Sequence, residues 1–574
     1  MSTETAVYLD FVTFERSLKP ADRALLEKRH LLFSYPVRSE NEFEMADYPV
    51  SQGLLMAACG QVGCQVDGEM ALIASTGVSL PEQAKQGVTH VIIHPMISSI
   101  DDLPDLVAAY RQRYPDALIV LQNSDQHQHE KLIGGPQSDE ISHELLNRLP
   151  QVDWVLRGFS EHALISLLLG LPTQAAMGQN GQGKNLSAFF TLDSLPQDFE
   201  AGGQTSKGRS IRVQRSRGCL SGCTYCIEGQ ANKSIESERS WDGVPIENFI
   251  DRLERLGEKG FFFINVIDSS FEDPGKRGLD DLRRFCGLLI ERKLKFSFKL
   301  HLRAENIVKL CPDDLTLMKK AGVDVIVSGL ESGEQTELDY YRKIASTETN
   351  RQACIQLEEQ NFFCNIFGHM MFAPMTTVDI YREKIAFLHS INRCWDFLNM
   401  TNRLLVFWGT RIHQQITEDG LAERQCVNPG WVDYRFKDLI VGQIDKRVNE
   451  MKRQHPEFLD LNNLIYDSMN LESRLLNPAN AHYLDMAAER FDVFRDRLNK
   501  RKSLLNDLYR DGFQKLAGDP DGAFLEGCDI AKEAESQRQD MASLLKFADD
   551  LEEKPETLFL HTWLSSVNRF GVGD

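Results

Sequence analysis

The run Arg217-Gly218-Cys219-Leu220-Ser221-Gly222-Cys223-Thr224-Tyr225-Cys226 is the most informative part of this 574-residue chain. Its three cysteines have the spacing C-x3-C-x2-C, in a segment of glycines and small residues. Such thiolates converge only if they share a ligand, and a soft set of sulfur ligands favours an iron–sulfur cluster. With three protein ligands, one iron of a four-iron cluster stays open to an outside molecule. The alternatives are three unrelated buried thiols, or a structural zinc site. Zinc needs a fourth Cys or His nearby, and none lies between Cys226 and Cys286.

Composition defines the broad class of the protein. A hydrophobic fraction of 42% and only 20 prolines are typical of an ordered globular chain, with room for about three or four domains. No apolar run is long enough to span a membrane, and the first residues lack the basic and apolar regions of a signal peptide. The twelve cysteines are spread out, which favours a reducing cytoplasm. The net charge of −20 favours solubility and argues against nucleic-acid binding. We therefore expect a cytoplasmic protein with no nucleic-acid and no membrane partner.

The first third of the chain alternates between strand and helix patterns. Strands are expected at 6–10, 88–94, 118–121 and 154–156, and helices from about Pro20 and at 49–59, 100–114, 141–149 and 161–169. The rest of 11–49 shows no clear pattern. This alternation predicts a parallel, doubly wound sheet, in which ligands bind at the carboxyl ends of the strands. A segment rich in Gly, Gln, Asn and Ser then predicts a linker.

The middle of the chain repeats the alternation in a second pattern. Strands are expected at 211–214, 261–267, 296–302, 323–328, 365–372 and 398–407, with helical segments between them. Six βα units predict a partial barrel, whose chemistry lies at the carboxyl ends of its strands. Beyond about residue 434 the pattern is helical and charged, with Leu504, Leu505 and Leu508 at helical spacing. The apolar stretch 558–564 is expected to pack back on the body. This last part could serve as a lid, a docking unit or a dimer interface.

The cysteine motif, with an aromatic residue directly before its last cysteine, resembles that of the radical S-adenosylmethionine (SAM) superfamily. The resemblance implies that Cys219, Cys223 and Cys226 bind a [4Fe-4S] cluster whose open iron binds SAM. It also implies reductive cleavage of SAM to a 5′-deoxyadenosyl radical, with electrons from a donor such as a flavodoxin or ferredoxin.

Residues at the expected strand ends extend this resemblance. Ser328-Gly329-Leu330-Glu331-Ser332-Gly333 matches the G-x-E-S-G motif, and Asp268-Ser269-Ser270-Phe271 is similar to the acidic turn after the second strand. The resemblance implies that SAM is bound by Tyr225, Asp268, Ser269, Arg303, Ser328, Glu331 and Ser332, with Lys343 also in the family pattern. The alternative for the charged residues is an internal salt-bridge network that fixes loops, and for Tyr225 a place in the core. Two further matches are the turn Pro374-Met375-Thr376-Thr377 and the closing stretch Gly409-Thr410-Arg411-Ile412 with Glu418-Asp419-Gly420-Leu421, where Ala373 and Trp408 depart from the family pattern.

A second resemblance concerns the first domain. Asp153-Trp154-Val155-Leu156-Arg157-Gly158-Phe159-Ser160-Glu161 is similar to the D-x-V-V-x-G-E-G-E stretch of the cobalamin-binding domains that precede many radical SAM barrels. Two departures stand out. The chain has no D-x-H-x-x-G motif, so no histidine ligand to cobalt is implied. In addition, 122–129 replaces a Gly-Gly-rich turn whose glycines let the backbone approach the corrin. The bulkier residues either re-form the site or close it.

Other residues carry weaker signals. His127 and His129 could share a metal on a strand, but a polar loop favours solvated side chains. Gly134-Gly135-Pro136 predicts a turn. Arg215 and Arg217 are expected to be solvated or to fix the loop. Six widely spaced cysteines are interpreted as buried thiols, with a second cluster as the alternative: Cys286, Cys311, Cys354, Cys364, Cys394 and Cys528. Cys426 is a candidate radical quencher.

Together these features predict an α/β protein. Its parts are a doubly wound Rossmann-like domain of cobalamin (B12)-binding type at 1–172, a linker at 173–208, a partial (β/α)6 radical SAM barrel at 209–425 and a helical domain at 426–574. The resemblance implies cobalamin-dependent C-methylation of an unactivated carbon in a peptide or small-molecule substrate. Two alternatives stay open. One is a cobalamin-independent rearrangement, epimerisation or ring formation with a vestigial first domain, and the other is an iron–sulfur or cobalamin sensor without turnover.

Overall fold

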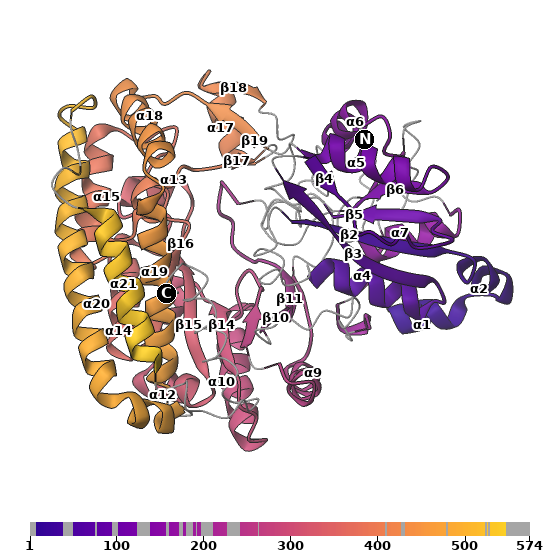
Figure 1. Ribbon diagram of the computed structural model, residues 1–574, viewed down its shortest axis with the longest axis horizontal. Helices are drawn as coiled ribbons and strands as arrows, with labels where there is room; N and C mark the ends of the chain where they lie inside the picture. The colour runs from indigo at the N-terminus through magenta and orange to yellow at the C-terminus, as the bar shows by residue number, and fades with distance from the viewer. Residues whose placement is uncertain are drawn as a thin grey trace.

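The chain folds into three adjoining bodies, which follow one another along the sequence in Figure 1. This computed structural model describes residues 7–37, 50–74, 77–94, 102–122, 138–156, 160–171, 176–178, 188–190, 192–196, 210–226, 241–261, 263–407, 410–425, 431–477, 480–522, 525 and 529–546. Among these, 7–196 contribute an α/β body, 210–434 a half-barrel with a small sheet beside it, and 439–546 a set of long helices.

The first body is built on a seven-stranded sheet in the order β4-β3-β2-β5-β6-β7-β8. The strands are β2 (His30–Val37), β3 (Gln65–Ala74), β4 (Gly77–Ser79), β5 (His90–Ile93), β6 (Leu118–Leu121), β7 (Trp154–Leu156) and β8 (Ala176–Gly178). The five central strands are parallel, and β4 and β8 pair antiparallel at the two edges.

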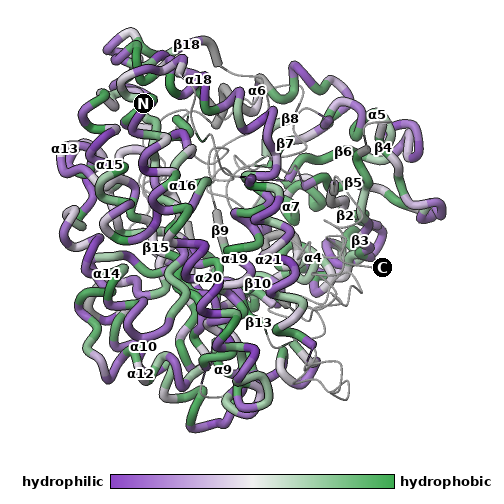
Figure 2. The backbone as a smooth tube through the Cα atoms, turned by 60° about the vertical axis from the view of Figure 1, so that its left-hand side comes forward, coloured by the Kyte–Doolittle hydropathy of each residue, from purple (hydrophilic) through white to green (hydrophobic). Residues whose placement is uncertain are grey.

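Helices cover both faces of this sheet. They are α4 (Val50–Gln61), α5 (Leu103–Arg113), α6 (Ser138–Arg148) and α7 (Ser160–Leu168). Buried residues of α4 and α7 share one apolar core with Phe33 and Ile92, whereas α5 packs into a separate core with Leu32 and Val91. Neighbouring residues of one strand thus lie in opposite cores, which confirms the predicted doubly wound architecture. In Figure 2 hydrophobic residues run along the strands of this sheet.

Four strands of this sheet were not predicted: the short edge strands β4 and β8, and the longer strands β2 and β3. β2 pairs with both β3 and β5, and its residues Leu31–Ser34 are fully buried. A parallel strand that is covered on both faces has no alternation of polar and apolar residues to reveal it. β3 carries Asp67 and Glu69 among its apolar residues, which hid its strand character.

The expected strand at the start of the chain, β1 (Val7–Leu9), joins a different partner. It pairs with β9 (Ala188–Phe190), so the predicted linker supplies β8 to the main sheet and β9 to this small ladder. Between β1 and β2 lie α1 (Phe11–Ser17) and α2 (Pro20–Leu26), and a short 3-10 turn, Leu192–Ser194, follows β9. The ring of Phe11 packs edge-on against Phe190 at 5.0 Å.

The half-barrel has five parallel strands in sequence order, β10-β13-β14-β15-β16. They are β10 (Ser210–Val213), β13 (Phe263–Val266), β14 (Ser297–His301), β15 (Val323–Gly329) and β16 (Phe363–Phe367). The covering helices are α9 (Ile246–Glu258), α10 (Gly275–Glu291), α11 (Ala304–Ile307), α12 (Pro312–Lys320), α13 (Gln335–Tyr340), α14 (Thr347–Glu359) and α15 (Val378–Ser390). A small antiparallel pair, β11 (Ser216–Gly218) and β12 (Trp241–Gly243), flanks β10.

The prediction of a sixth strand at 398–407 is wrong for most of its length. Asp396 caps a helix there, α16 (Phe397–Thr401), by accepting a hydrogen bond from the backbone N–H of Asn399 at 3.3 Å. An isolated parallel bridge between Phe372 and Arg403 stands where strand pairing would continue. The remainder forms β17 (Val406–Phe407) in a small sheet with β18 (Ala422–Gln425) and β19 (Trp431–Tyr434), next to α17 (Arg411–Glu418).

Four long helices follow in the described residues from 439 to 545, as the charged helical pattern predicted. They are α18 (Leu439–Gln454), α19 (Glu457–Leu475), α20 (Ala481–Leu516) and α21 (Ile530–Leu545). α19 lies against the sheet, where the hydroxyl of Ser473 donates to the carbonyl of Asp324 at 2.6 Å. Leu505 is buried and Leu504 exposed, as a helix with one apolar face requires. The stretch 558–564 lies outside the described residues. Within the part of the chain that the structure describes, no helix is long and apolar enough to cross a membrane.

Two buried histidines make the stability of the first body sensitive to acid. Burial lowers the pKa of His94 to about 3, and burial together with the charge of Arg29 lowers that of His90 to about 4. Both rings are therefore neutral in the fold, while the unfolded chain takes up protons near the ordinary pKa. The contribution of these two histidines to the unfolding free energy is fully present above the ordinary pKa of histidine. It is lost as the pH falls from there toward the lowered pKa of the folded state.

We expect wild-type protein to lose about 2 kcal/mol more unfolding free energy between pH 7 and pH 5 than His94→Gln does. Urea denaturation at the two pH values measures this difference. His455→Gln, at an exposed position, is the matched control and should retain the wild-type pH dependence. Equal pH dependence of His94→Gln and wild type would contradict the prediction.

Candidate functional site

The three motif cysteines lie on one short loop that follows β11. Cys223 is buried, and Cys219 and Cys226 are partly exposed. The backbone N–H of Ser221 donates to Sγ of Cys219 at 3.4 Å, and the Ser221 hydroxyl lies 3.2 Å from Sγ of Cys223. The loop therefore folds back on its own sulfur atoms.

Backbone contacts fix this cysteine loop against other elements. Thr224 donates through its N–H to the carbonyl of Tyr341 at 2.9 Å and through its hydroxyl to that of Tyr340 at 3.1 Å. Its own carbonyl accepts from the N–H of Ile412 in α17 at 3.2 Å. The loop is thus held between α13 and α17, at the carboxyl end of the half-barrel.

Asp268 fixes the entry to the loop. Its Oδ1 accepts from the backbone N–H groups of Arg215 and Ser216 at 2.7 and 2.9 Å, and its Oδ2 accepts from the Ser216 hydroxyl at 2.8 Å. Both carboxylate oxygens are therefore engaged by the chain itself. This geometry favours the loop-fixing alternative for Asp268, and its contact with SAM stays a prediction.

Arg303 connects the end of β14 to the cysteine loop. Its Nη2 donates to Asp273 at 2.6 Å, and its Nε lies 3.3 Å from Oε1 of Glu272. Asp273 in turn accepts from the backbone N–H of Leu220 at 3.3 Å. Burial lowers the pKa of Arg303, but the charges of Glu272, Asp273 and Cys219 outweigh it and raise the pKa overall. A lasting positive charge therefore lies beside Cys219.

Glu331 lies at the carboxyl end of β15 in a left-handed backbone conformation, with φ of +64°. Non-glycine residues rarely adopt this conformation, and such strain gathers at functional sites. Its buried carboxylate is hydrogen-bonded to Tyr225, and burial raises its pKa. A Cβ on Gly368 would lie 2.7 Å from Oε2 of Glu331, so the glycine leaves the carboxylate its room.

Lys343 brings a second positive charge to the loop. Its Nζ donates to the carbonyl of Gly329 at 3.2 Å and lies 3.4 Å from Oε1 of Glu331. Burial lowers the pKa of Lys343, but the charges of Glu331 and Cys223 reverse the effect and raise it. A cation beside a cysteine favours the thiolate, which is the form that binds metal.

The remaining residues predicted to bind SAM differ in their surroundings. The ring of Tyr225 stands edge-on against Tyr341 at 5.5 Å, close to Glu331 and to Cys226. Ser269 is partly exposed just beyond β13. Ser328 is buried, and its hydroxyl has no hydrogen-bond partner among the described residues.

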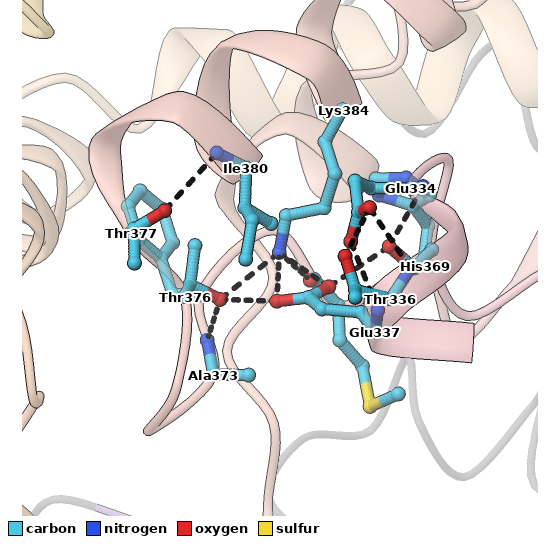
Figure 3. Close-up of polar contacts among 12 residues, drawn as sticks. Glu334, Thr336, Glu337, His369, Ala373, Thr376, Thr377, Ile380 and Lys384 are labelled. Carbon is cyan, nitrogen blue, oxygen red and sulfur yellow. Dashed lines mark hydrogen bonds and ion pairs between the residues drawn. The ribbon is translucent and has the colours of Figure 1, made fainter. Parts of the chain in front are cut away.

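Ser332 belongs instead to a buried network that the sequence reasoning missed. Its hydroxyl donates to Oε2 of Glu337 at 2.8 Å. The same carboxylate accepts hydrogen bonds from the ammonium of fully buried Lys384 at 2.9 and 3.0 Å. It also accepts one from the hydroxyl of Thr376 at 2.5 Å (Figure 3). Lys384 also donates to the carbonyl of Met370 at 2.9 Å. This network ties the turn after β15 to the turn after β16. The Pro374–Thr377 motif was the one visible sign of it.

Arg215 and Arg217 fix the loop, which is the second of the two alternatives that were expected for them. The guanidinium of Arg215, only 1% exposed, donates to Asp281 at 2.8 Å and to the carbonyl of Phe271 at 2.9 Å. Arg217, 4% exposed, forms a 2.6 Å ion pair with Glu161, which is 2% exposed. Glu161 is the last residue of the stretch that resembles cobalamin-binding domains, so this pair joins the first body to the cysteine loop.

The other cysteines are mostly buried, as predicted. Cys286, Cys354, Cys364 and Cys394 are buried, whereas Cys311 is exposed at the start of α12, so the prediction for that residue is wrong. Some residues named in the sequence analysis lie outside the described residues: His127, His129, 134–136, Cys426 and Cys528, together with Trp408 and Gly409 of the closing stretch. Among the described residues, no three His, Cys, Asp or Glu side chains could hold a single metal ion.

Proteins of known activity are similar in sequence to part of this chain. No protein-family model matches the chain. An anaerobic magnesium-protoporphyrin IX monomethyl ester cyclase of Synechocystis is 24% identical over 272 residues, which are 44% of this chain and 49% of the cyclase. A bacteriochlorophyllide d C-8(2)-methyltransferase of Chlorobaculum tepidum is 20% identical over 239 residues, 41% of this chain and 49% of the methyltransferase. The chain thus matches about half the length of these curated relatives.

Solved structures cover more of the chain. OxsB, a cobalamin-dependent SAM radical enzyme with aqua-cobalamin bound, has a TM-score of 0.56 at 16% identity, over 95% of this chain and 84% of OxsB. TsrM of Kitasatospora setae, a radical SAM methyltransferase with cobalamin and a [4Fe-4S] cluster bound, has a TM-score of 0.50 at 12% identity, over 68% of this chain and 78% of TsrM. These findings confirm the resemblance to cobalamin-type radical SAM enzymes and the fold that it implied.

The Glu161–Arg217 pair provides a test of how the first body is joined to the loop. Glu161→Ala leaves a buried guanidinium without its carboxylate and should cost about 3–5 kcal/mol of unfolding free energy. The double variant Glu161→Ala/Arg217→Met removes both charges and should lose less than the sum of the two single losses. Urea denaturation of the wild type, Glu161→Ala, Arg217→Met and the double variant gives the coupling energy between the two side chains.

Lys500→Ala is the control, because Lys500 forms an exposed ion pair with Asp496. This variant should unfold like the wild type. Strictly additive losses in the Glu161 and Arg217 variants would show that the pair does not hold the two bodies together.

Proposed function

We propose that this protein is a radical SAM enzyme whose cluster is held by Cys219, Cys223 and Cys226. One observation carries the proposal: the cysteine loop lies against the carboxyl end of the half-barrel with Glu331, Tyr225 and Lys343 on one side and Arg303 on the other. Three sulfur donors flanked by two cations suit a cluster that must take up an electron, because nearby positive charge favours the reduced form.

The same residues fit SAM as the second ligand. The buried carboxylate of Glu331 can accept from the amino group of SAM or from a ribose hydroxyl. Ser269 lies just beyond β13, and the hydroxyl of Ser328 in β15 has no hydrogen-bond partner among the described residues. We propose that Asp268 and Ser332 position the residues that contact SAM. Their own polar groups are bound within the chain.

We further propose that the first domain binds cobalamin at the carboxyl edge of its parallel strands. Gln122 follows β6 at this edge; it is buried, and its Oε1 has no hydrogen-bond partner among the described residues. A buried acceptor without a partner costs free energy unless a ligand satisfies it. The match to OxsB over 95% of this chain supports the proposal. When bound, the cluster supplies the electron that cleaves SAM, and cobalamin supplies a methyl carrier.

The reaction that fits these cofactors best is C-methylation of an unactivated carbon in a peptide or small-molecule substrate. The similarity to TsrM and to the bacteriochlorophyllide methyltransferase supports it. Ring formation is the second candidate, because the Synechocystis relative is a cyclase. In either case the enzyme needs an electron donor, and we propose a flavodoxin or ferredoxin. We propose domain limits of 1–172, 209–425 and 426–574, with the linker 173–208 contributing β8 and β9 to the first body.

The cluster assignment predicts that alanine at Cys219, Cys223 or Cys226 abolishes 5′-deoxyadenosine formation. Each change removes one of three protein ligands, so the cluster cannot be held in its open form. Anaerobically reconstituted variants are incubated with SAM and dithionite, and the nucleoside is quantified by chromatography. Cys311→Ala, at an exposed cysteine far from the motif in sequence, is the control and should form wild-type amounts. Undiminished product in a motif variant would refute the assignment.

The cobalamin assignment predicts that the protein retains about one equivalent of corrin after reconstitution with hydroxocobalamin and desalting. The absorbance spectrum reports both groups. A corrin band together with S-adenosylhomocysteine as a product would support methylation. A cluster spectrum without corrin, with 5′-deoxyadenosine as the co-product, would favour the cobalamin-independent candidate. Binding of SAM without cleavage, even with substrate and reductant, would favour a sensor.

A further inference from the structure

Glu305 is a buried carboxylate of the half-barrel that belongs to no motif of the sequence. It lies in the short helix α11, directly after β14, and is only 9% exposed. In the sheet, β14 lies between β13 and β15. Ser269 and Glu331, two residues predicted to bind SAM, lie just beyond those two neighbouring strands. Glu305 therefore lies at the carboxyl end of the half-barrel, after the strand between them.

Glu272 fixes the backbone on both sides of Glu305. Its Oε1 accepts from the backbone N–H of Arg303 at 2.9 Å and from Nδ2 of Asn306 at 2.9 Å. Glu272 is fully buried, and hydrogen bonds to a buried carboxylate are strong. The protein itself therefore holds Glu305 in place, and no ligand is needed to position it.

Glu305 makes the longest contact of the three carboxylates that share the guanidinium of Arg303. Nη2 of Arg303 donates to Asp273 at 2.6 Å, and its Nε lies 3.3 Å from Glu272 and 3.5 Å from Oε1 of Glu305. The second oxygen of Glu305, Oε2, is buried and has no hydrogen-bond partner among the described residues. A buried acceptor of this kind costs free energy until a donor reaches it.

The charge of Glu305 also acts on the opposite side of the cysteine loop. Burial raises the pKa of Glu331, and the negative charge of Glu305 raises it further. Burial lowers the pKa of Lys343, but the charges of Glu331, Cys223 and Glu305 outweigh this effect and raise it overall. The carboxylate of Glu305 thus lies within range of both Arg303 and the Glu331–Lys343 pair.

The carboxylates on the β14 side of the loop outnumber their cation. Arg303 is shared by Glu272, Asp273 and Glu305, whereas Lys343 is paired with Glu331. An excess of buried negative charge is costly, and a ligand that brings hydrogen-bond donors relieves that cost. SAM brings such donors, because it carries an amino group and ribose hydroxyls.

We propose that Glu305 binds SAM as a second carboxylate beside Glu331, by accepting a hydrogen bond from the amino group or from a ribose hydroxyl of SAM. The inference rests on the proposed radical SAM function and adds a residue to its binding site. Two carboxylates beyond adjacent strands hold two different donor groups of one molecule. They fix its orientation at the cysteine loop more firmly than a single contact does.

The test measures SAM binding by the anaerobically reconstituted full-length protein, without reductant, so that SAM is not cleaved. In calorimetric titrations Glu305→Gln should bind SAM at least about tenfold more weakly than the wild type, the value of one charge-assisted hydrogen bond. Glu305→Asp keeps the charge on a shorter side chain and should bind SAM more tightly than Glu305→Gln. Glu348→Gln, the same change at an exposed position, should bind as the wild type does.

Iron content and the cluster spectrum of the same preparations separate SAM binding from a role in fixing the loop. A loss of SAM affinity in Glu305→Gln at wild-type iron content supports the proposal. Wild-type SAM affinity in this variant would overturn it. A loss of SAM affinity matched by a loss of iron would also overturn it, because Glu305 would then act only through Arg303 and the loop.

Two analogues of SAM identify the donor. 5′-Methylthioadenosine lacks the amino group, and S-adenosylhomocysteine keeps the amino group and the hydroxyls but lacks the sulfonium charge. If Glu305→Gln weakens SAM and S-adenosylhomocysteine alone, Glu305 accepts from the amino group. If it weakens all three ligands, Glu305 accepts from a ribose hydroxyl. A loss confined to SAM would overturn the proposed hydrogen bond, because Glu305 would then act on the sulfonium charge.

The same titrations distinguish this inference from the proposed function. A wild type that binds and cleaves SAM, together with wild-type affinity in Glu305→Gln, would overturn the inference alone. A wild type that binds SAM but does not cleave it in the presence of reductant would refute the proposed reaction alone. A wild type that does not bind SAM would overturn both.

Discussion

The structure depends on the fixing of one short loop. Three thiols can share a ligand only if the loop that carries them is held from several sides, and the chain does so with buried polar groups. Asp268 takes two backbone N–H groups and one hydroxyl at the entry of the loop, and Thr224 is bound to α13 and α17 at its far end. Hydrogen bonds to a buried carboxylate are strong because little water competes for it. Both the entry and the far end of the cysteine loop are therefore fixed by buried polar contacts.

The sequence reveals those parts of the fold that local chemistry dictates. The cysteine spacing and the turn from Ser328 to Gly333 are short motifs, and the structure places their residues together. β2 was missed because a strand buried on both faces has no alternating pattern. The sixth strand was mistaken because Asp396 starts a helix in an apolar stretch. The Lys384–Glu337 pair joins residues 47 positions apart, and one sequence cannot reveal such a long-range contact.

The cations beside the cysteine loop are balanced by carboxylates. Arg303 is paired with Glu272 and Asp273, and Lys343 lies 3.4 Å from Glu331. Exposed charges are screened by salt, and buried ones much less so. These buried pairs therefore keep their strength at salt concentrations that weaken the interactions of the exposed charges.

The buried Glu161–Arg217 pair gives the first body and the half-barrel a defined relation. Burying two charges together costs free energy, and separating them inside the protein costs more. The pair therefore stabilises one arrangement of the two bodies over slightly shifted ones. Arg217 lies two residues before Cys219, and Glu161 lies in the first turn of α7, the helix that follows β7 of the first sheet. A shift of the first body would therefore pull on the cysteine loop directly. An enzyme that passes a group from one cofactor to another needs such a constraint, because the distance between cofactors has to be set by the protein and not by either ligand.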